Sequence, residues 1–294
     1  MENSAHISDL ARLAVLMTIY NRREKTLAAL ERLFAQDVLS QFQMQVIILD
    51  DGSTDGSSEA IKEAYPEVKI IPGDGTYFWN RGMHHIFGQA LAQDFDFYLW
   101  LNDDTFLYPD ALNNLWLTWQ GLGPKAIIAG STEDPDKFAP TYGGFIRVSR
   151  WTLKLVEVGA LDFVQEIDAM HGNCVLIPKA VSDLVGNIEP FYRHRWGDPD
   201  YALRAKKLGC KVFLAAGYIG TCPANPLAEA WTDVSLSFRE RLADFHSIKG
   251  YGRKDWFFYM RRHGGILWPL LWLKPYFDML LSSIRHRISP QTAS

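Results

Sequence analysis

Apolar runs alternate with stretches of helical periodicity along the first part of the chain. Residues 13–18 form a continuous apolar run, which is typical of a strand buried on both faces of a parallel sheet. Leucines then recur at helical spacing between residues 27 and 34. Further strands are expected over 46–49, 68–71 and 95–101, with helices over 57–65 and 82–93. Strand and helix alternate four times in about 100 residues, which predicts a doubly wound, mostly parallel α/β sheet.

The pattern changes after Pro109. A loosely alternating stretch over 142–158 indicates an antiparallel hairpin. Residues 200–208 are expected to form a helix that ends before Gly209, a usual place for glycine after a helix. Short strands are also expected over 125–130 and 174–177. The parallel half should therefore be followed by a small antiparallel element.

Polar residues follow each of the first four predicted strands. The four clusters are residues 18–21, 50–51, 73–75 and 102–104. Ligands of doubly wound sheets bind at this edge, because the carboxyl ends of the parallel strands meet there. One cluster could arise by chance, but four in succession indicate a binding site.

The composition narrows the classes of function. A chain of 294 residues, 48% of them hydrophobic, can build one large α/β domain with an appendage. Its net charge of −4 provides no basic field, so no nucleic-acid partner is expected. The three cysteines are scattered, with neither metal-ligand spacing nor a disulfide framework. This usage favours a reducing, cytoplasmic location.

No targeting or membrane-spanning segment is expected. The apolar run 13–20 is too short for a signal peptide. No segment reaches the roughly 18 apolar residues of a spanning helix.

The C-terminal region is expected to be a helical extension over 226–294, after a main domain over 1–225. Residues 266–273 are strongly apolar and lie between basic residues, while Pro269 and Pro275 interrupt any long helix. This pattern suits an interfacial helix on the inner face of the cytoplasmic membrane. It suits equally a helical cap that packs on the core or on a second subunit of a homodimer.

Asp103 and Asp104 directly follow the fourth predicted strand. Adjacent carboxylates repel each other unless a cation or solvent screens them. Oxygen ligands suit Mg²⁺ or Mn²⁺, particularly where substrate phosphates complete the coordination shell. Helix capping, the alternative explanation, fits Asp110 better because the next helix is expected to start there. The two aspartates are therefore a candidate metal site.

Three segments in this order and spacing carry a family resemblance: LMTIYNR, VIILDDGSTDGS and YLWLNDDTFLYPDAL. They resemble the inverting family-2 glycosyltransferases, which have the nucleotide-binding GT-A fold. The resemblance implies a nucleotide-sugar donor and a Mn²⁺ or Mg²⁺ ion. Residues 102–104 match the family's DxD-type element, in which the final Asp, here Asp104, meets the metal on the donor diphosphate. Asp103 is then its partner, and Asn102 departs from the literal motif.

The resemblance also implies a donor pocket around the first three strand ends. Residues 18–22 would border the nucleotide, and Asp51 or Asp50 would contact the base or ribose. The alternative is that 50–55 form only an Asx-rich turn. Residues 73–83 resemble the family's donor-facing loop, and a helix N-terminus near Gly82 would favour a diphosphate. The predicted donor-binding residues are Thr18, Tyr20, Asn21, Arg22, Asp50, Asp51, Gly75, Trp79, Arg81, Gly82, Asn102 and Asp103. Arg81 could add a charge-assisted contact to the donor, but a role as an ordinary surface arginine is nearly as well supported.

An inverting transfer needs a base that deprotonates the attacking hydroxyl group. Residues 196–204 match the family's acidic motif, but Gly197 stands where Glu is common. Asp198 is therefore the predicted base. Asp200 is expected behind it or as a helix cap, and Arg204 one turn later could pair with Asp200.

Residues 168–178 also resemble the family, in which this stretch lines the acceptor side. Together with 142–144 and 217–222, they look closest to the branch that contains bacterial rhamnosyltransferases. Many relatives place a metal-binding His after the last core strand, but 217–225 contains none. The predicted acceptor-side residues are His171, Gly172, Asn173, Trp196 and Asp200. A packed, hydrogen-bonded role explains His171 equally well.

The resemblance implies a metal-dependent inverting transfer from a UDP- or dTDP-sugar, with dTDP-rhamnose among the candidates. The acceptor would be a glycan or a lipid-linked molecule in cell-surface polysaccharide assembly. A sugar-phosphate nucleotidyltransferase is one alternative, but its usual Gly-rich first loop is missing from 18–23. A non-catalytic nucleotide- or carbohydrate-binding protein is another. Binding alone would not require Asp103, Asp104 and Asp198 together.

Overall fold

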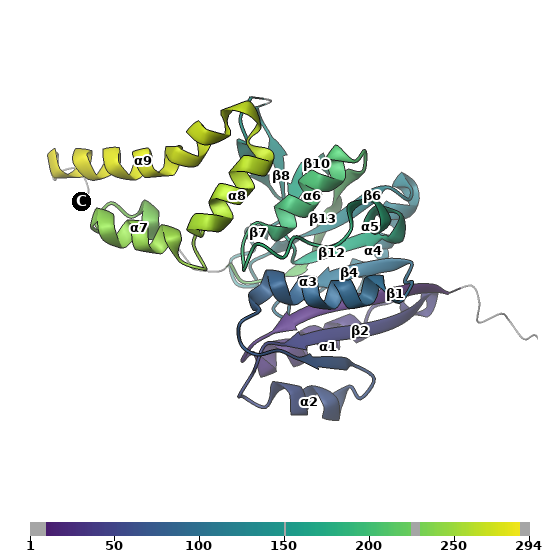
Figure 1. Ribbon diagram of the computed structural model, residues 1–294. Helices are drawn as coiled ribbons and strands as arrows, with labels where there is room; N and C mark the ends of the chain where they lie inside the picture. Colours follow the sequence, from purple (N-terminus) through teal and green to yellow (C-terminus); the bar gives the residue numbers. More distant parts are fainter. Residues whose placement is uncertain (1–9, 150, 225–229, 289–294) are drawn as a thin grey trace, which may run out of the picture.

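The computed structural model describes residues 10–149, 151–224 and 230–288 (Figure 1). The helices are α1 (Arg23–Phe34), α2 (Ser57–Ala64), α3 (Phe78–Leu91), α4 (Ala111–Leu122), α5 (Lys179–Val185), α6 (Gly197–Lys207), α7 (Phe238–His246), α8 (Arg253–His263) and α9 (Trp268–Ile288). Short 3₁₀ turns lie at Leu39–Gln41, Ala230–Thr232 and Gly265–Leu267.

The strands form one large and one small sheet. Those of the large sheet are β1 (Ala11–Ile19), β2 (Phe42–Asp50), β3 (Lys69–Pro72), β4 (Phe97–Leu101), β5 (Phe106–Leu107), β6 (Ala126–Glu133), β7 (Pro140–Tyr142), β10 (Gln165–Ile167), β12 (Cys174–Pro178) and β13 (Lys211–Thr221). Its main path runs β10-β13-β6-β12-β4-β1-β2-β3, with β5 paired to β13 and β7 to β6. The small sheet is β11 (Ala169–Met170), β8 (Gly144–Arg147) and β9 (Leu155–Val158), in the order β11-β8-β9.

The parallel half of the sheet confirms the predicted alternation. Strands β4, β1, β2 and β3 are neighbours and run parallel. Residues of β1 alternate between the two faces of the sheet: Ala14 and Leu16 pack in one core, Leu13 and Val15 in the other. Both faces bury apolar surface, which explains why the run lacks polar residues.

Helices cover both faces of the sheet, as expected for a doubly wound fold (Figure 1). Helices α3, α5 and α6 pack on one face, and α1, α2 and α4 pack on the other. The carboxyl ends of β1, β2 and β4 open onto the same edge, so the loops that follow them can share a site.

Three details of the fold could not be taken from the sequence or differ from the expected bounds. Strand β12 lies antiparallel between β4 and β6. Strand β13 was not predicted, because its pairing with β6 shifts register around Gly217, whose φ is +67°. Such a bulge breaks the regular pattern of a strand. Helix α3 begins at Phe78, so Gly82 lies in its second turn. A Cβ at Gly82 would come within 2.8 Å of the methyl group of Thr18, so the glycine lets α3 pack closely on β1.

The predicted hairpin is confirmed by β8 and β9, which pair antiparallel in the small sheet. Residue Met170 of β11 pairs with Gly144 of β8 just before the chain enters β12. The small sheet therefore stands next to the loop that carries the predicted acceptor-side residues.

The C-terminal helices form the extension that the sequence predicts, and α9 projects away from the sheet (Figure 1). Buried side chains of these helices, including Phe245, Tyr259 and Met279, belong to the same core as α3 and α6. The expected boundary at 225/226 lies outside the described residues. Within the described ranges, no helix combines the length and the hydropathy that a membrane crossing requires.

Candidate active site

Arg22 lies across the two carboxylates that follow β4. Its Nη1 is 2.9 Å from Oδ1 of Asp103 and 2.6 Å from Oδ2 of Asp104. Because β1 and β4 are parallel neighbours, the loops after them meet at one edge of the sheet. A guanidinium carries several N–H donors in one plane, which suits it to carboxylate groups. A cation of the protein thus balances the acidic pair, Asp103 and Asp104.

The two carboxylates of the acidic pair differ in their surroundings. Asp103 is 6% exposed, and burial raises its pKa to about 7 although the charge of Arg22 opposes the rise. The side chain of Asp104 is 20% exposed, and the thiol of Cys222 contacts it at 3.7 Å. Burial raises the pKa of Cys222 to about 12, so this thiol stays protonated. The described part of the chain contains no group of three His, Cys, Asp or Glu side chains that could hold a metal ion.

The indole of Trp79 connects the loop of the acidic pair to the predicted base. Its Nε1 donates to Oδ1 of Asn102 at 2.8 Å. The other end of the ring lies against Gly172, where an added Cβ would meet ring carbons at 2.6 Å and Cβ of Asp198 at 3.3 Å. The backbone N–H of Gly172 donates in turn to Oδ2 of Asp198 at 2.8 Å. These four residues, here called the Trp79 wall, come from four separate segments.

Asp198 lies in the first turn of α6 and is partly exposed. Burial raises its pKa above the ordinary value, while the charge of His171 and the N–H of Gly172 oppose the rise. The helix N-terminus also favours a negative charge at this position. A carboxylate with a raised pKa is a better proton acceptor than a fully solvated one, provided that it is ionised. The surroundings of Asp198 therefore suit a general base.

The carboxylate of Asp51 binds backbone amides of the loop between β3 and α3. Its Oδ1 accepts the N–H groups of Gly75 at 2.9 Å and Tyr77 at 3.2 Å, and its Oδ2 accepts that of Phe78 at 2.9 Å. The carboxylate thus occupies the N-terminus of α3. The expectation of a helix N-terminus near Gly82 was wrong, because α3 starts at Phe78 and Asp51 already binds its first amide groups. A contact of Asp51 with a base or ribose stays a prediction.

Asp50 belongs to a hydrogen-bonded turn after β2. It accepts the N–H of Ser53 at 2.8 Å and the hydroxyl group of Ser58. This arrangement matches the Asx-rich turn that was the alternative to ligand binding. Asn21, with a φ of 50°, connects the loop after β1 to the same turn, since its Oδ1 accepts the N–H of Thr54 at 2.8 Å.

The remaining predicted donor residues lie around these loops. Tyr20 is 58% exposed directly after β1, and Thr18 is half-buried beneath α3. Arg81 is exposed, and its Nε donates to the carbonyl oxygen of Pro190 at 3.3 Å. The shallow hollow that it lines contains neither carboxylate of the acidic pair, which fits the surface interpretation of Arg81.

Three other predicted acceptor-side residues lie near Asp198 in the chain or in space. His171 and Asn173 flank Gly172, whose N–H donates to Asp198, and Trp196 precedes Asp198 by two residues. Nε2 of His171 lies 2.9 Å from Glu157, and its ring packs on Phe145 of the small sheet. Asn173 is 6% exposed, and its carbonyl oxygen accepts the N–H of Asn102 at 2.9 Å. Trp196 precedes α6 and packs on aromatic side chains of α8.

The prediction for Asp200 needs correction. Its side chain is 0% exposed, so it does not face an acceptor in this structure. The predicted pairing with Arg204 is confirmed, with Nε of Arg204 2.8 Å from Oδ2. The second partner, His263, belongs to α8 and lies 2.7 Å from Oδ1. Asp200 therefore joins α6 to the C-terminal extension.

Asn80 is a residue that sequence analysis did not identify. It is fully buried, and its Nδ2 donates to the carbonyl oxygens of Glu189 at 2.7 Å and Tyr192 at 2.8 Å. Its Oδ1 faces Gly197, where an added Cβ would lie only 1.6 Å away. This explains the glycine at a position where the family commonly has Glu. The partners of Asn80 are backbone carbonyls more than 100 residues later, which leave no local signal.

Cys222 was also missed as a neighbour of the acidic pair. Its one signal in the sequence was its place within 217–225, the stretch in which many relatives of the family are expected to carry a metal-binding His. The sulfur of Cys222 contacts Asp104 and lies 3.5 Å from Nδ2 of Asn173. Cys222 is therefore a buried neighbour of both the acidic pair and the predicted acceptor side.

Solved structures that share this fold over most of the chain include a mannosyltransferase and S. aureus TarS. The mannosyltransferase PcManGT from Pyrobaculum calidifontis, in complex with GDP-Man and Mn²⁺, is 15% identical with a TM-score of 0.51. The match covers 97% of this chain and 89% of that protein. S. aureus TarS 1–349 is 12% identical with a TM-score of 0.51, and the match covers 85% of this chain and 69% of that one. These likenesses establish the GT-A fold.

Sequence comparisons identify the family. No curated protein gives a significant match. The family model described as Glycosyl transferase family 2 matches residues 14–183, more than half of the chain. The matched residues include most of β1, all of β2 to β4, the acidic pair and Gly172, while Asp198 lies beyond them. The chain therefore belongs to glycosyl transferase family 2.

Proposed function

We propose that this chain is a metal-dependent, inverting glycosyltransferase. It would move a sugar from a nucleoside-diphosphate sugar to a hydroxyl group of a glycan or lipid-linked acceptor. The Trp79 wall supports this proposal best, because one indole ring spans from Asn102, in the loop of the acidic pair, to Gly172, whose N–H donates to Asp198. A donor diphosphate at one end and a base at the other would bracket the reacting sugar.

The acidic pair fits a divalent metal ion that is bound together with a diphosphate. Asp103 and Asp104 offer carboxylate oxygens, which Mg²⁺ and Mn²⁺ prefer. Two carboxylates do not fill an octahedral shell, so phosphate oxygens and water would provide the other ligands. A bound ion would neutralise charge that develops on the leaving diphosphate. Arg22, which contacts both carboxylates, would bind phosphate oxygens beside them.

Asp198 would accept the proton of the acceptor hydroxyl group while that oxygen attacks the anomeric carbon. The N–H of Gly172 holds Oδ2 at 2.8 Å, so Oδ1 is the oxygen that would take the proton. Attack from the side opposite the leaving diphosphate inverts the anomeric configuration. His171 and Trp196 would border the acceptor next to this carboxylate, since both belong to the segments that contact it.

The donor is proposed to be a UDP- or dTDP-sugar. Support for dTDP-rhamnose, and for a role in cell-surface polysaccharide assembly, comes from the likeness of 142–144, 168–178 and 217–222 to bacterial rhamnosyltransferases. The mannosyltransferase of similar fold was solved with GDP-Man, so guanosine donors belong in the same comparison.

A donor screen tests the proposed function. The full chain is incubated with UDP-, dTDP- and GDP-sugars and Mn²⁺, with and without a chelator, and nucleotide products are separated. We expect one donor to release its nucleoside diphosphate, the chelator to stop the reaction, and the product to have the inverted anomeric configuration. A nucleotidyltransferase would release pyrophosphate from a nucleoside triphosphate and a sugar phosphate, and a binding protein would show no turnover. The absence of metal-dependent binding or turnover of every donor would refute the proposal.

We also propose that the extension over 226–294 attaches the chain to the inner face of the cytoplasmic membrane. Exposed apolar side chains recur at intervals of about one or two helical turns along α9 and the turn before it. The exposed ones are Ile266 (89%), Leu270 (66%), Phe277 (57%), Leu280 (46%), Leu281 (50%) and Ile284 (45%). Arg261, Lys274 and Arg285 are exposed beside them, and basic flanks around an apolar face fit anionic lipid.

Vesicle sedimentation tests the membrane contact. The chain should bind phosphatidylcholine vesicles that contain phosphatidylglycerol, and bind pure phosphatidylcholine much less. The double variant Leu270→Ser, Phe277→Ser should lose binding, whereas Phe138→Ser, which changes a 76% exposed residue between β6 and β7, should keep it. If the double variant instead breaks a homodimer and no vesicle binds, the face of α9 joins two copies and the membrane proposal fails.

A further inference from the structure

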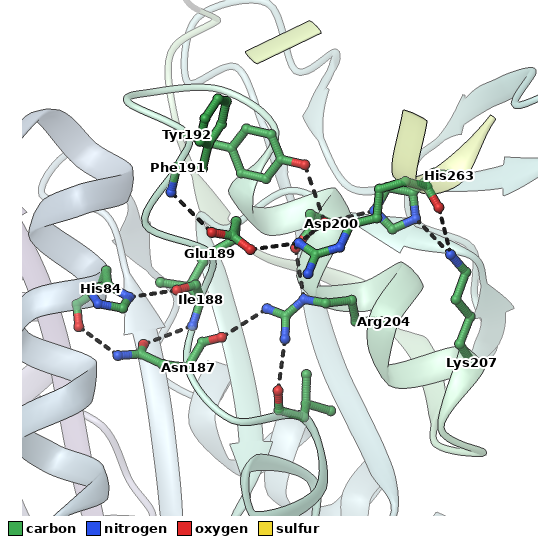
Figure 2. A network of polar contacts seen from close by, with 12 residues as sticks. His84, Asn187, Ile188, Glu189, Phe191, Tyr192, Asp200, Arg204, Lys207 and His263 are labelled. Carbon is green, nitrogen blue, oxygen red and sulfur yellow. Dashed lines mark hydrogen bonds and ion pairs between the residues drawn. The ribbon is translucent and has the colours of Figure 1, made fainter. Parts of the chain in front are cut away.

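A buried polar network joins the first turn of α6 to helix α8 of the C-terminal extension (Figure 2). Its centre is Asp200, whose side chain is 0% exposed. Oδ1 lies 2.7 Å from Nε2 of His263, and Oδ2 lies 2.8 Å from Nε of Arg204. Burial alone would raise the pKa of Asp200, but the hydrogen bond from His263 and the charge of Arg204 outweigh it and lower the pKa. Asp200 is therefore ionised, and both of its carboxylate oxygens accept hydrogen bonds.

The other charged side chains around Asp200 are also paired within this network. Nη1 of Arg262 lies 2.7 Å from Oε2 of Glu189 and 3.2 Å from Oδ1 of Asp200. The other nitrogens of Arg204 donate to the carbonyl oxygens of Val185 at 2.8 Å and Asn187 at 2.9 Å. Two arginines thus face two carboxylates, so His263 does not need a positive charge to balance the site.

His263 acts in this network as a neutral hydrogen-bond donor. Burial lowers its pKa, although the bond to Asp200 opposes the shift. Its Nδ1 lies 3.3 Å from Nζ of Lys207, which also donates to the carbonyl oxygen of Arg262 at 3.0 Å. An ammonium group can only donate, so Nδ1 must accept. The ring proton is therefore on Nε2 and points to Asp200.

The residue just before α6 is held by the same part of the extension. Nε1 of Trp196 donates to the carbonyl oxygen of Tyr251 at 2.9 Å, and its ring lies 4.6 Å from that of Tyr259. The N–H of Asp200 donates to the carbonyl oxygen of Trp196 at 2.9 Å. Asp198 lies between these two anchored residues, and the fixed φ of Pro199 stiffens the link.

We propose that His263 is a positioning residue for Asp198. Through its hydrogen bond to Asp200 it fixes the first turn of α6, and with it the carboxylate of Asp198 against Gly172. Helix α8 is then part of the acceptor half of the site. The proposal rests on the proposed function, since it takes Asp198 to be the base of the transfer.

A matched pair of variants, His263→Gln and His263→Asn, tests this role. The amide nitrogen of Gln can reach the place of Nε2 and donate to Asp200, whereas Asn is one methylene shorter. Both side chains are neutral and polar, so only their reach differs. We expect His263→Asn to lower kcat about 10- to 100-fold, because displacements of about 1 Å have such effects, with the donor KM unchanged. His263→Gln should stay close to wild type.

Hydrogen exchange gives a readout that needs no turnover. The N–H of Gly172 donates to Asp198, so its exchange should become faster in His263→Asn and not in His263→Gln. His246→Asn is the matched control, because Nε2 of His246 lies 3.1 Å from the hydroxyl group of Tyr276 inside the extension. If His263→Asn does not fold, Lys207→Met is the milder variant, because loss of the ammonium frees the ring to change tautomer. It should shift kcat and Gly172 exchange in the same direction.

The outcomes separate the two proposals. Equal kcat and equal Gly172 exchange in the Asn and Gln variants would overturn the positioning role of His263. A wild-type chain that turns over no donor, while Gly172 exchange still responds to His263→Asn, would count against the transferase proposal and support the structural link.

Discussion

A guanidinium nitrogen of Arg22 lies 2.6 Å from a carboxylate oxygen of Asp104, the distance of a charge-assisted hydrogen bond. The same nitrogen reaches Asp103 at 2.9 Å. The side chain of Arg22 is 42% exposed, so the guanidinium can move without disturbing the core. A divalent ion and Arg22 would compete for the same oxygens. A donor diphosphate would offer the arginine a new partner.

We expect Arg22→Ala to bind Mn²⁺ more tightly than wild type when no nucleotide is present, because the acidic pair loses its own counter-charge. Its affinity for a nucleoside diphosphate should fall, since the phosphate oxygens lose a donor. Electron paramagnetic resonance of free Mn²⁺ and calorimetry with UDP, dTDP and GDP measure the two affinities. Titration at alkaline pH limits proton binding to Asp103, whose pKa burial raises to about 7.

Arg23→Ala is the control for this prediction. It removes the same charge one residue later, and the contact that Arg23 makes through its backbone N–H is with Asp55 at 3.0 Å. Mn²⁺ binding should be unchanged in this variant. Weaker or unchanged Mn²⁺ binding in Arg22→Ala would contradict the competition between arginine and metal.

Asp198→Asn should remove transfer while nucleotide binding stays nearly unchanged. The amide oxygen can still accept the N–H of Gly172, but it cannot take a proton, and a general base contributes about 10²- to 10⁴-fold. Because burial raises the pKa of Asp198, kcat/KM of wild type should fall on acidification at a higher pH than an ordinary Asp would give. Asp183→Asn, at an exposed residue of α5, is the control. Turnover by Asp198→Asn comparable to wild type would rule out this base.

Trp79→Phe should weaken catalysis by removing the N–H that donates to Asn102 at 2.8 Å while keeping an aromatic ring. A neutral hydrogen bond is worth about 1 kcal/mol, so kcat/KM for the donor should fall several-fold. Asn102→Ala should have a similar effect. The double variant should be no worse than either single variant, since all three lose the same bond. Fully additive losses would show that the two residues act independently.

The parallel half of the fold could be predicted from the sequence because local pattern and tertiary burial agree there. Residues 13–17 are buried on both faces of the sheet, and an unbroken apolar run is what this position requires. Strand β13 shows the opposite case. Its register shifts near Gly217 break the alternation, so the strand is defined by its pairing with β6 rather than by its own residues.

The acidic pair could also be predicted, since Asp103 and Asp104 follow β4 directly. The local pairing of Asp200 with Arg204 could be predicted as well, but the other side-chain partners of the carboxylates could not, because they come from distant segments. His263 stands 63 residues after Asp200, and nothing in the local pattern of α8 marks it as a buried partner. The role of Asp51 was equally hidden, because its partners are backbone amides, which every residue type but proline offers.

His194 should make the folded chain sensitive to acid. Burial, followed by the charges of Arg195, Lys249 and Arg22, lowers its pKa from 6.5 to about 4. Between these values the unfolded chain binds a proton that the folded chain does not, so stability falls as pH decreases through this window. The loss at pH 5 is at most about 2 kcal/mol for one such group. Urea unfolding at neutral pH and at pH 5 should show a smaller loss in His194→Gln than in wild type. Equal losses would exclude this cause.

Gly197 lies where Asn80 leaves no room for a side chain. A Cβ there would stand 1.6 Å from Oδ1 of Asn80, whose amide nitrogen is held by two backbone carbonyls. Gly197→Ala should therefore destabilise the chain by about 1–3 kcal/mol. Gly121→Ala, in α4 where a Cβ meets nothing within 4 Å, should stabilise by up to about 1 kcal/mol. Urea unfolding measures both, and Asn80→Ala added to Gly197→Ala should recover part of the loss by making space. A Gly197→Ala variant as stable as wild type would mean that the start of α6 can move away from α3.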